Sequence, residues 1–313
     1  MGKQDTKAKE YLQDNRRFAD VVNYFLYDGK PVVKAEQLLE QDTTEVITIQ
    51  ELDAKEDYVQ KWRDLLKKMV VKTDNSVSYV LIGIENQTEI HYATPVKNML
   101  YDAINYGSQV KQIARENKKS GNYADGSEFL SGIKKTDKLI PVVTIVVYLG
   151  TRDWDAPRSL HEMLEYRDAS ILRFVPDYKV NLIIPKEVED FDKFSTEVRY
   201  LFKVLGMADK QEAWSKVFAT DRAYREMDNE TVSAINLFAG AAFPLNKKKG
   251  VTDMCKAWDD MKSENFKQGL EQGLEQAAIE MIRENDSDEK IHRITKLPLS
   301  RIAELREKEM CFV

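Results

Sequence analysis

The sequence has few of the residues that cross-link a protein or bind soft metals. Only 2 of its 313 residues are cysteines, and Cys255 and Cys311 lack the number and spacing of a disulfide framework or a zinc site. The three histidines, His91, His161 and His292, are too scattered in the sequence to suggest a ligand set. A reducing cytoplasm is therefore the expected environment.

The sequence also lacks a long apolar run and an excess of positive charge. Its most apolar stretch, residues 139–150, is about half as long as a membrane-spanning helix, so we expect a buried strand and no membrane association. The polar start, MGKQDTKAKEYLQ, has no apolar signal-peptide region, which again predicts a cytoplasmic protein. The net charge of -6 excludes a surface that is basic everywhere, so a nucleic-acid partner would need a local basic cluster.

Hydrophobic residues make up 42% of the chain, and their spacing predicts alternating helices and strands. Residues 5–27 predict an amphipathic helix with a break near Asp14, and residues 94–117 predict a long helix that begins at Thr94-Pro95. Residues 45–52, 65–72 and 78–87 predict three strands, the last two joined by a polar turn at 73–76. Residues 139–149 and 180–184 predict buried strands. A mixed α/β sheet flanked by helices is the expected core.

The composition predicts three segments, with the core in residues 1–185, a helical subdomain in 186–262 and a helical tail in 263–313. The tail contains a tandem repeat, GLEQ at 269–272 and again at 273–276. Its two glycines share a helical face on which another backbone can approach closely, which predicts self-association through this C-terminal helix. The last 25 or so residues fit either a small helix-turn-helix or two short helices that dock on the body or on a partner.

Two carboxylates and an amide are expected to converge at the open end of the predicted hairpin. Asp64 begins its first strand, while Glu85 and Gln87 share a face of the second. Converging carboxylates repel one another unless a cation lies between them, which predicts a Mg²⁺ or Mn²⁺ site with the Asn86 carbonyl as a further ligand. Taken alone, the spacing favours an aspartate that caps a strand and a glutamate that pairs with a lysine.

Several segments, in this order, resemble the Rpn family of recombination-promoting nucleases, whose members are also classed as transposases. The segments are RDLL at 63–66, VLIGIENQT at 80–88, KNMLY at 97–101 and LIPVVTIVVYLG at 139–150, with Trp154 and Pro157 behind it. The start, Asp5 to Lys9, and the C-terminal repeat also resemble that family. The resemblance implies a restriction-endonuclease-like core of the PD-(D/E)XK type that cuts double-stranded DNA with a divalent metal.

The resemblance also implies a role for individual residues. Asp64 corresponds to the first metal ligand and Glu85 to the second, and Gln87 stands where most PD-(D/E)XK enzymes have lysine. Glutamine cannot supply a positive charge, and Lys97, on the following helix, is a candidate to supply it, with Tyr101 one turn further on. Lys97 equally fits a solvated helix residue.

These observations predict a metal-dependent endodeoxyribonuclease, associated with recombination or a mobile element. The main alternative is a catalytically weak or inactive protein of the same fold that binds DNA or a protein partner. A glycosidase is disfavoured because the strand lacks exposed aromatic residues for stacking on sugars. The expected DNA contacts are basic side chains near the cleft: Lys67, Lys68, Lys111, Arg115, Lys118 and Lys119.

Overall fold

The computed structural model describes the backbone of residues 3–40, 44–50, 56–62, 65–73, 76–165 and 168–310. It describes their side chains except those of residues 3, 44–50, 56–62, 70–73, 76–79, 85 and 310. The chain divides into two compact units, Met1–Trp214 with Asp228–Ala241, and Ser215–Met227 with Ala242–Val313. The three segments expected from composition, with boundaries at 185 and 262, stay a prediction.

A five-stranded mixed sheet forms the centre of the first unit, with the strand order β1-β4-β5-β6-β7. Its strands are β1 (Leu38–Glu40), β4 (Leu65–Thr73), β5 (Ser76–Gln87), β6 (Val142–Tyr148) and β7 (Asn181–Ile183). β1, β4 and β5 pair antiparallel, whereas β5, β6 and β7 pair parallel. The prediction of an α/β core with a mixed sheet between helices is therefore confirmed.

The predicted hairpin is present as β4 and β5, and its register runs from Thr73↔Ser76 to Leu65↔Ile84. The strand expected at 45–52 is present as β2 (Thr44–Gln50), but it lies outside the main sheet. It pairs with β3 (Glu56–Trp62), a strand that the pattern did not predict. The edge of the main sheet next to β4 is occupied by the short β1 instead.

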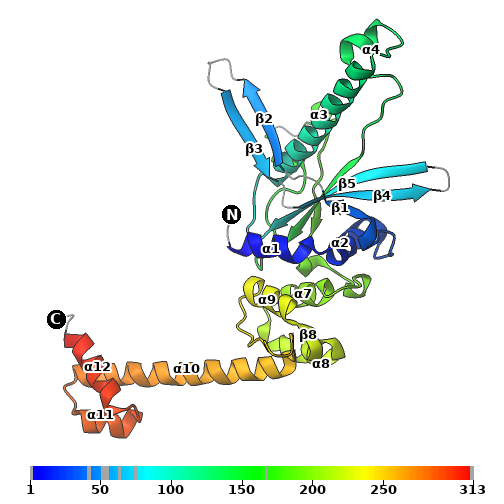
Figure 1. Ribbon diagram of the computed structural model, residues 1–313. Helices are drawn as coiled ribbons and strands as arrows, with labels where there is room; N and C mark the ends of the chain where they lie inside the picture. The colour runs from blue at the N-terminus through cyan, green and yellow to red at the C-terminus, as the bar shows by residue number, and fades with distance from the viewer. Residues whose placement is uncertain are drawn as a thin grey trace. The chain divides into compact units, whose positions relative to one another are not determined.

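Two consecutive helices, α1 (Lys3–Gln13) and α2 (Asn15–Tyr27), cover one side of the sheet (Figure 1). The break predicted near Asp14 is confirmed, because the Asp14 carboxylate caps α2 by accepting from the backbone N–H groups of Arg16 and Arg17. The apolar face of α2, with Phe18 fully buried, packs inward. α2 ends at Asp28, which has a left-handed φ of 54°.

The long helix α3 (Thr94–Ser120) lies on the other side of the sheet (Figure 1). Its N-cap residue is Ala93, and Thr94 is the first helical residue rather than the cap. Asp102 fixes α3 to the sheet by accepting hydrogen bonds from Thr144 on β6, at 2.6 Å, and from Tyr178, at 2.6 Å. A helix of this length between β5 and β6 is the crossover that a parallel strand pair requires.

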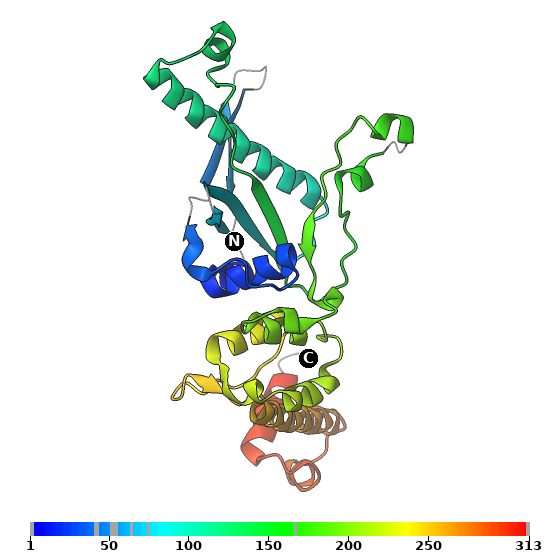
Figure 2. The ribbon, with the colours of Figure 1, turned by 90° about the vertical axis from the view of Figure 1, so that its right-hand side faces the viewer.

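The chain between β6 and β7 extends outward as a long loop that carries two single-turn helices (Figure 2). The two helices of this loop are α5 (Leu160–Met163) and α6 (Ala169–Leu172), and the short α4 (Gly126–Ser131) lies between α3 and β6. Two further helices of the first unit, α7 (Val198–Leu205) and α9 (Asn229–Phe238), follow β7. α7 and α9 contact each other and the α1–α2 layer, so the first unit includes helices well beyond residue 185.

The second unit contains the long helix α10 (Met254–Arg283), followed by α11 (Asp288–Thr295) and α12 (Leu299–Met310). α11 and α12 pack on the end of α10 through a small apolar cluster that includes Ala278, Ile291 and Ile302. DNA contact by this module stays a prediction, as does self-association through α10. A Cβ added at Gly269 or Gly273 would meet nothing within 4 Å.

Three further short elements are α8 (Trp214–Thr220), β8 (Met227–Asp228) and β9 (Val251–Thr252), and short 3-10 helices occur in several of the connecting segments. None of the helices in the described ranges has the length and apolar content needed to cross a membrane.

Candidate functional site

The predicted site residues fall at the open end of the β4–β5 hairpin and at the start of α3. Asp64 lies outside the described residues. Glu85 lies in β5 with Val146 as its register partner on β6, and its side chain is outside the description. Gln87 ends β5 opposite Tyr148 and is 5% exposed. Lys97 lies in the first turn of α3.

A chain of hydrogen bonds fixes the orientation of the Gln87 amide. The Thr94 hydroxyl donates its single proton to the His91 carbonyl, so its oxygen can only accept from Gln87. The Gln87 Nε2 group donates to that oxygen at 3.3 Å. The amide nitrogen therefore points at Thr94, and Oε1 must point away from it. The hydrogen bond thus decides which end of an otherwise ambiguous amide faces Thr94, and the other end is an acceptor.

Three buried polar atoms at this place have no hydrogen-bond partner among the described residues: Gln87 Oε1 and both side-chain polar atoms of Asn98. Asn98 is 1% exposed and lies one helical turn after Thr94, on the same face of α3. An orphaned buried polar atom costs about 1–3 kcal/mol, so three together are expensive unless a ligand or water satisfies them. Two of the three are oxygen acceptors, the type of group that hard cations and their water molecules bind.

Lys97 and Tyr101 are in contact, as their four-residue spacing predicts. The Lys97 ammonium lies 5.7 Å from the centre of the Tyr101 ring, within the range of a cation–π interaction. Lys97 is half-buried and Tyr101 is 4% exposed. The lysine is therefore held at the start of α3 by a ring that faces the sheet. Its role in chemistry stays a prediction.

Tyr148, the register partner of Gln87, closes the end of this region. Burial raises the pKa of its phenol, and its ring meets Trp154 edge-on with 5.2 Å between centroids. Gly150 is required beside it, because a Cβ at that position would lie 2.4 Å from the Tyr148 ring. Gly150 and Trp154 thus pack closely against Tyr148 at the end of β6.

Asn86 lies on the opposite face of β5 from Gln87, because neighbouring residues of a strand alternate. Its side chain is 5% exposed. Thr88, on the same face as Asn86, donates to the Asp5 carboxylate of α1 at 3.0 Å. The Asp5 end of the chain therefore packs beneath the strand that carries the predicted ligands. The proposed ligand role of the Asn86 backbone carbonyl stays a prediction.

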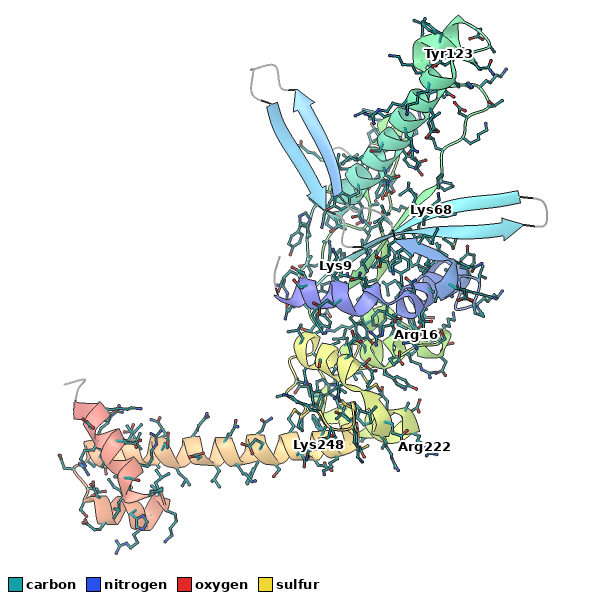
Figure 3. The ribbon with its side chains drawn as sticks, viewed as in Figure 1. Lys9, Arg16, Lys68, Tyr123, Arg222 and Lys248 are labelled. Carbon is teal, nitrogen blue, oxygen red and sulfur yellow. The ribbon has the colours of Figure 1, made fainter. Side chains whose placement is uncertain are left out.

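The basic residues expected to contact DNA differ in their accessibility. The expectation for Lys67 was wrong: its side chain is 1% exposed, donates to the Gln13 carbonyl at 2.6 Å and to Asn15, and lies over the Phe18 ring. Desolvation by burial lowers the pKa of the Lys67 ammonium. Lys68, labelled in Figure 3, points to the opposite face of β4 and is half-exposed.

The other four basic residues expected to contact DNA lie on α3 and are exposed on its outer half, toward the end marked by Tyr123 in Figure 3. Lys111, Arg115 and Lys118 follow one another at spacings of four and three, so they form one stripe along the helix. Lys119 extends the cluster. A stripe of this kind is the local basic surface that a net acidic chain needs if it is to bind nucleic acid.

Sequence reasoning missed Asn98 and Asp102. Val96 and Val110, which belong to the apolar stripe of the helix predicted at 94–117, are both 38% exposed. The buried face of α3 instead contains Thr94, Asn98 and Tyr101. Polar residues at spacings of four and three, in the turns after a strand that carries a carboxylate, were the available signal.

No three His, Cys, Asp or Glu side chains among those described lie close enough together to hold a metal ion. The side chains of Asp64 and Glu85 are not among those described. A cavity of about 610 Å³ between α1 and α9 is lined by none of the predicted site residues. No family model, curated protein or solved structure matches the chain.

Proposed function

We propose that the chain is a divalent-metal-dependent DNA endonuclease with a restriction-endonuclease-like core of the PD-(D/E)XK type. The observation that carries the proposal is the orientation of Gln87, whose Oε1 is buried without a partner two residues after Glu85. Alternation along β5 assigns positions 85 and 87 to the same face. An acceptor left unpaired beside a carboxylate position suits a hydrated cation better than it suits an apolar core.

The proposed ligands of the cation are the carboxylates of Asp64 and Glu85 and the backbone carbonyl of Asn86. The orphaned oxygens of Gln87 and Asn98 fit a hard cation, because all of these groups are oxygen donors. When bound, Mg²⁺ or Mn²⁺ would supply the lowered pKa of a water molecule and the charge withdrawal that phosphodiester hydrolysis needs. The proposal requires the Asp64 carboxylate to reach the Glu85 carboxylate across the end of the hairpin.

In this proposal, Gln87 and Lys97 together replace the lysine that is usual in this fold. Gln87 orients the water molecule, and Lys97 supplies the positive charge. Gln87 offers only an acceptor in this direction, so it orients a water molecule and contributes no charge. Lys97, held against Tyr101, supplies the positive charge that stabilises the negative charge developing on the phosphate. This division explains why a glutamine at position 87 is compatible with hydrolysis.

Double-stranded DNA is the proposed substrate, and the stripe of Lys111, Arg115 and Lys118 on α3 is its proposed backbone contact. The same helix supplies Lys97 at its other end, so one rigid element connects the DNA contact to the site. Phosphate contacts of this kind give affinity and register without sequence preference. A role in recombination or in a mobile element follows from the resemblance to the Rpn family.

A plasmid-nicking assay tests the proposal. Purified protein is incubated with supercoiled DNA in Mg²⁺, in Mn²⁺ and in chelator, together with the variants Asp64→Ala and Glu85→Ala. We expect nicking only with the metals and a loss of at least about a hundredfold in each variant, because both remove a proposed ligand.

Glu89→Ala is the matched control, since Glu89 is an exposed acid just beyond the strand that pairs with Arg152 at 2.9 Å. It should nick like the wild type. Cleavage that survives in both Asp64→Ala and Glu85→Ala would overturn the proposed site. Metal-independent binding of DNA without any cleavage would favour the alternative of an inactive DNA-binding protein of the same fold.

A further inference from the structure

Two buried asparagines of the first unit differ in their hydrogen bonding. Asn23, 6% exposed on α2, is fully used: its Nδ2 donates to the Val33 carbonyl at 2.9 Å, and its Oδ1 accepts from the Val33 N–H at 2.8 Å. Asn98, 1% exposed on α3, has no hydrogen-bond partner for either atom in the structure. The protein satisfies the first amide completely, whereas the described residues supply no partner for the second.

We propose that Asn98 is a positioning residue that hydrogen-bonds water molecules of the cation's hydration shell; this inference rests on the proposed function. The orphaned set near Thr94 contains two acceptors, Gln87 Oε1 and Asn98 Oδ1, and one donor group, Asn98 Nδ2. A bare cation would satisfy only the acceptors, and a phosphate oxygen only the donor group. Water satisfies both kinds, and water polarised by a cation is the stronger donor to the two acceptors.

The position of Asn98 supports this assignment. It lies one turn beyond Thr94, the residue that turns the Gln87 amide, and one turn before Asp102, which fixes α3 to β6. Hydrogen bonds to the sheet therefore fix the helix one turn before and one turn after Asn98. Groups that contact a metal through its water or its ligands typically change metal affinity by 10- to 100-fold when they are removed.

The test is Mn²⁺ binding by the full chain, measured by calorimetry and by the loss of the free-ion electron paramagnetic resonance signal. We expect Asn98→Leu, which is similar in volume, to weaken Mn²⁺ binding about tenfold or more. Asn23→Leu is the matched control: it should lower the melting temperature, because two hydrogen bonds are lost, but leave the Mn²⁺ affinity unchanged within about twofold. Unchanged Mn²⁺ affinity in Asn98→Leu, with a raised melting temperature, would overturn the inference.

A second measurement uses the wild-type chain, in case Asn98→Leu does not fold. In a Mg²⁺ titration followed by nuclear magnetic resonance, the Nδ2 signal of Asn98 should shift with saturation, and that of Asn23 should stay in place. An unmoved Asn98 signal, in a chain that binds Mg²⁺ through Glu85, would overturn this inference and leave the proposed function standing. Absence of any saturable Mg²⁺ or Mn²⁺ binding by the wild type would overturn both.

Discussion

The two helical layers on either side of the five-stranded sheet differ in whether their buried polar side chains have hydrogen-bond partners. In the α1–α2 layer, Asp20, Asn23 and Lys67 are each buried and each bonded to named protein partners. Beneath the start of α3, Gln87 and Asn98 are equally buried but keep three polar atoms without a partner. The three named groups of the first layer are bonded within the protein, although Arg17 Nε on α2 is buried without a hydrogen bond to the described residues. The atoms without a partner beneath α3 are two acceptors and one donor group.

This difference predicts that substitutions on the two sides of the sheet affect different properties of the protein. A buried polar group that is fully bonded contributes to a unique packing, and its loss costs stability. A buried polar group left unpaired costs stability, and a bound water molecule, ion or other ligand can offset that cost. Substitutions in the α1–α2 layer should therefore act on unfolding, and substitutions beneath α3 on binding.

The largest effect is expected for Asp20→Ala in the α1–α2 layer. The Asp20 carboxylate accepts from the backbone N–H groups of Ser195 and Thr196, both at 2.8 Å, and from their hydroxyls. Removing it leaves two partly buried N–H groups and two hydroxyls without their charged acceptor, so the free energy of unfolding in urea should fall by about 3 kcal/mol. Asp20→Asn, which keeps one acceptor, should lose less. A loss below about 1 kcal/mol in Asp20→Ala would contradict this account of the layer.

The next effect concerns the exposed stripe of α3. Reversing Lys111, Arg115 and Lys118 to glutamate should weaken binding to duplex DNA about tenfold or more, because three phosphate contacts are replaced by repulsion. The slope of log affinity against log salt should fall by about 3 in magnitude. Fluorescence anisotropy over a range of salt concentrations measures both quantities.

The lysines of the exposed loop 247–249 in the second unit provide the matched control. Reversing Lys247, Lys248 and Lys249 changes the net charge by the same amount at a different place. Equal weakening by the two triple variants would show that net charge, and not the α3 stripe, determines binding.

A smaller effect is expected for Thr94→Val, which removes the hydroxyl that turns Gln87 and keeps the side-chain volume. The unfolding free energy should fall by about 1 kcal/mol, and Mn²⁺ affinity by a few-fold, because the Gln87 amide is no longer held in one orientation. Thr94→Ser keeps the hydroxyl and should behave like the wild type. A Thr94→Val chain with full stability and full metal affinity would show that the hydrogen-bond chain does not orient Gln87.

Most of the fold could be predicted from the sequence because its signals are local. The break at Asp14, the β4–β5 hairpin and the long helix after Thr94 each depend on a cap, a turn or a periodic pattern within a few residues. The pairing of β2 with β3, and not with the main sheet, could not be predicted. Pairing partners depend on tertiary packing, which alternation along one strand does not encode.

The site was predicted less completely, for a related reason. Gln87 and Lys97 stood out because they sit beside a recognisable strand and helix start. Asn98 did not, because only the packing of α3 shows that an asparagine in a helix is buried and unpaired. Conversely, Lys67 looked like a surface charge in the sequence, and only the fold shows that α1 and α2 cover it.

Lys67 gives the smallest and most specific effect, through the dependence of stability on pH. Its folded pKa is lowered by desolvation, whereas the unfolded chain has the ordinary value of about 10.4. Between these two values the unfolded state holds a proton that the native state has released, so wild-type stability rises with pH there. Lys67→Met, close in volume, should be less stable than the wild type at pH 7, because the Gln13 carbonyl loses its donor, and it should lack this rise. The difference in unfolding free energy between the two chains should therefore grow as pH increases toward 10. A difference that shrinks instead would mean that Glu40 and Asp14, the nearby acids, stabilise the charged form more than burial disfavours it.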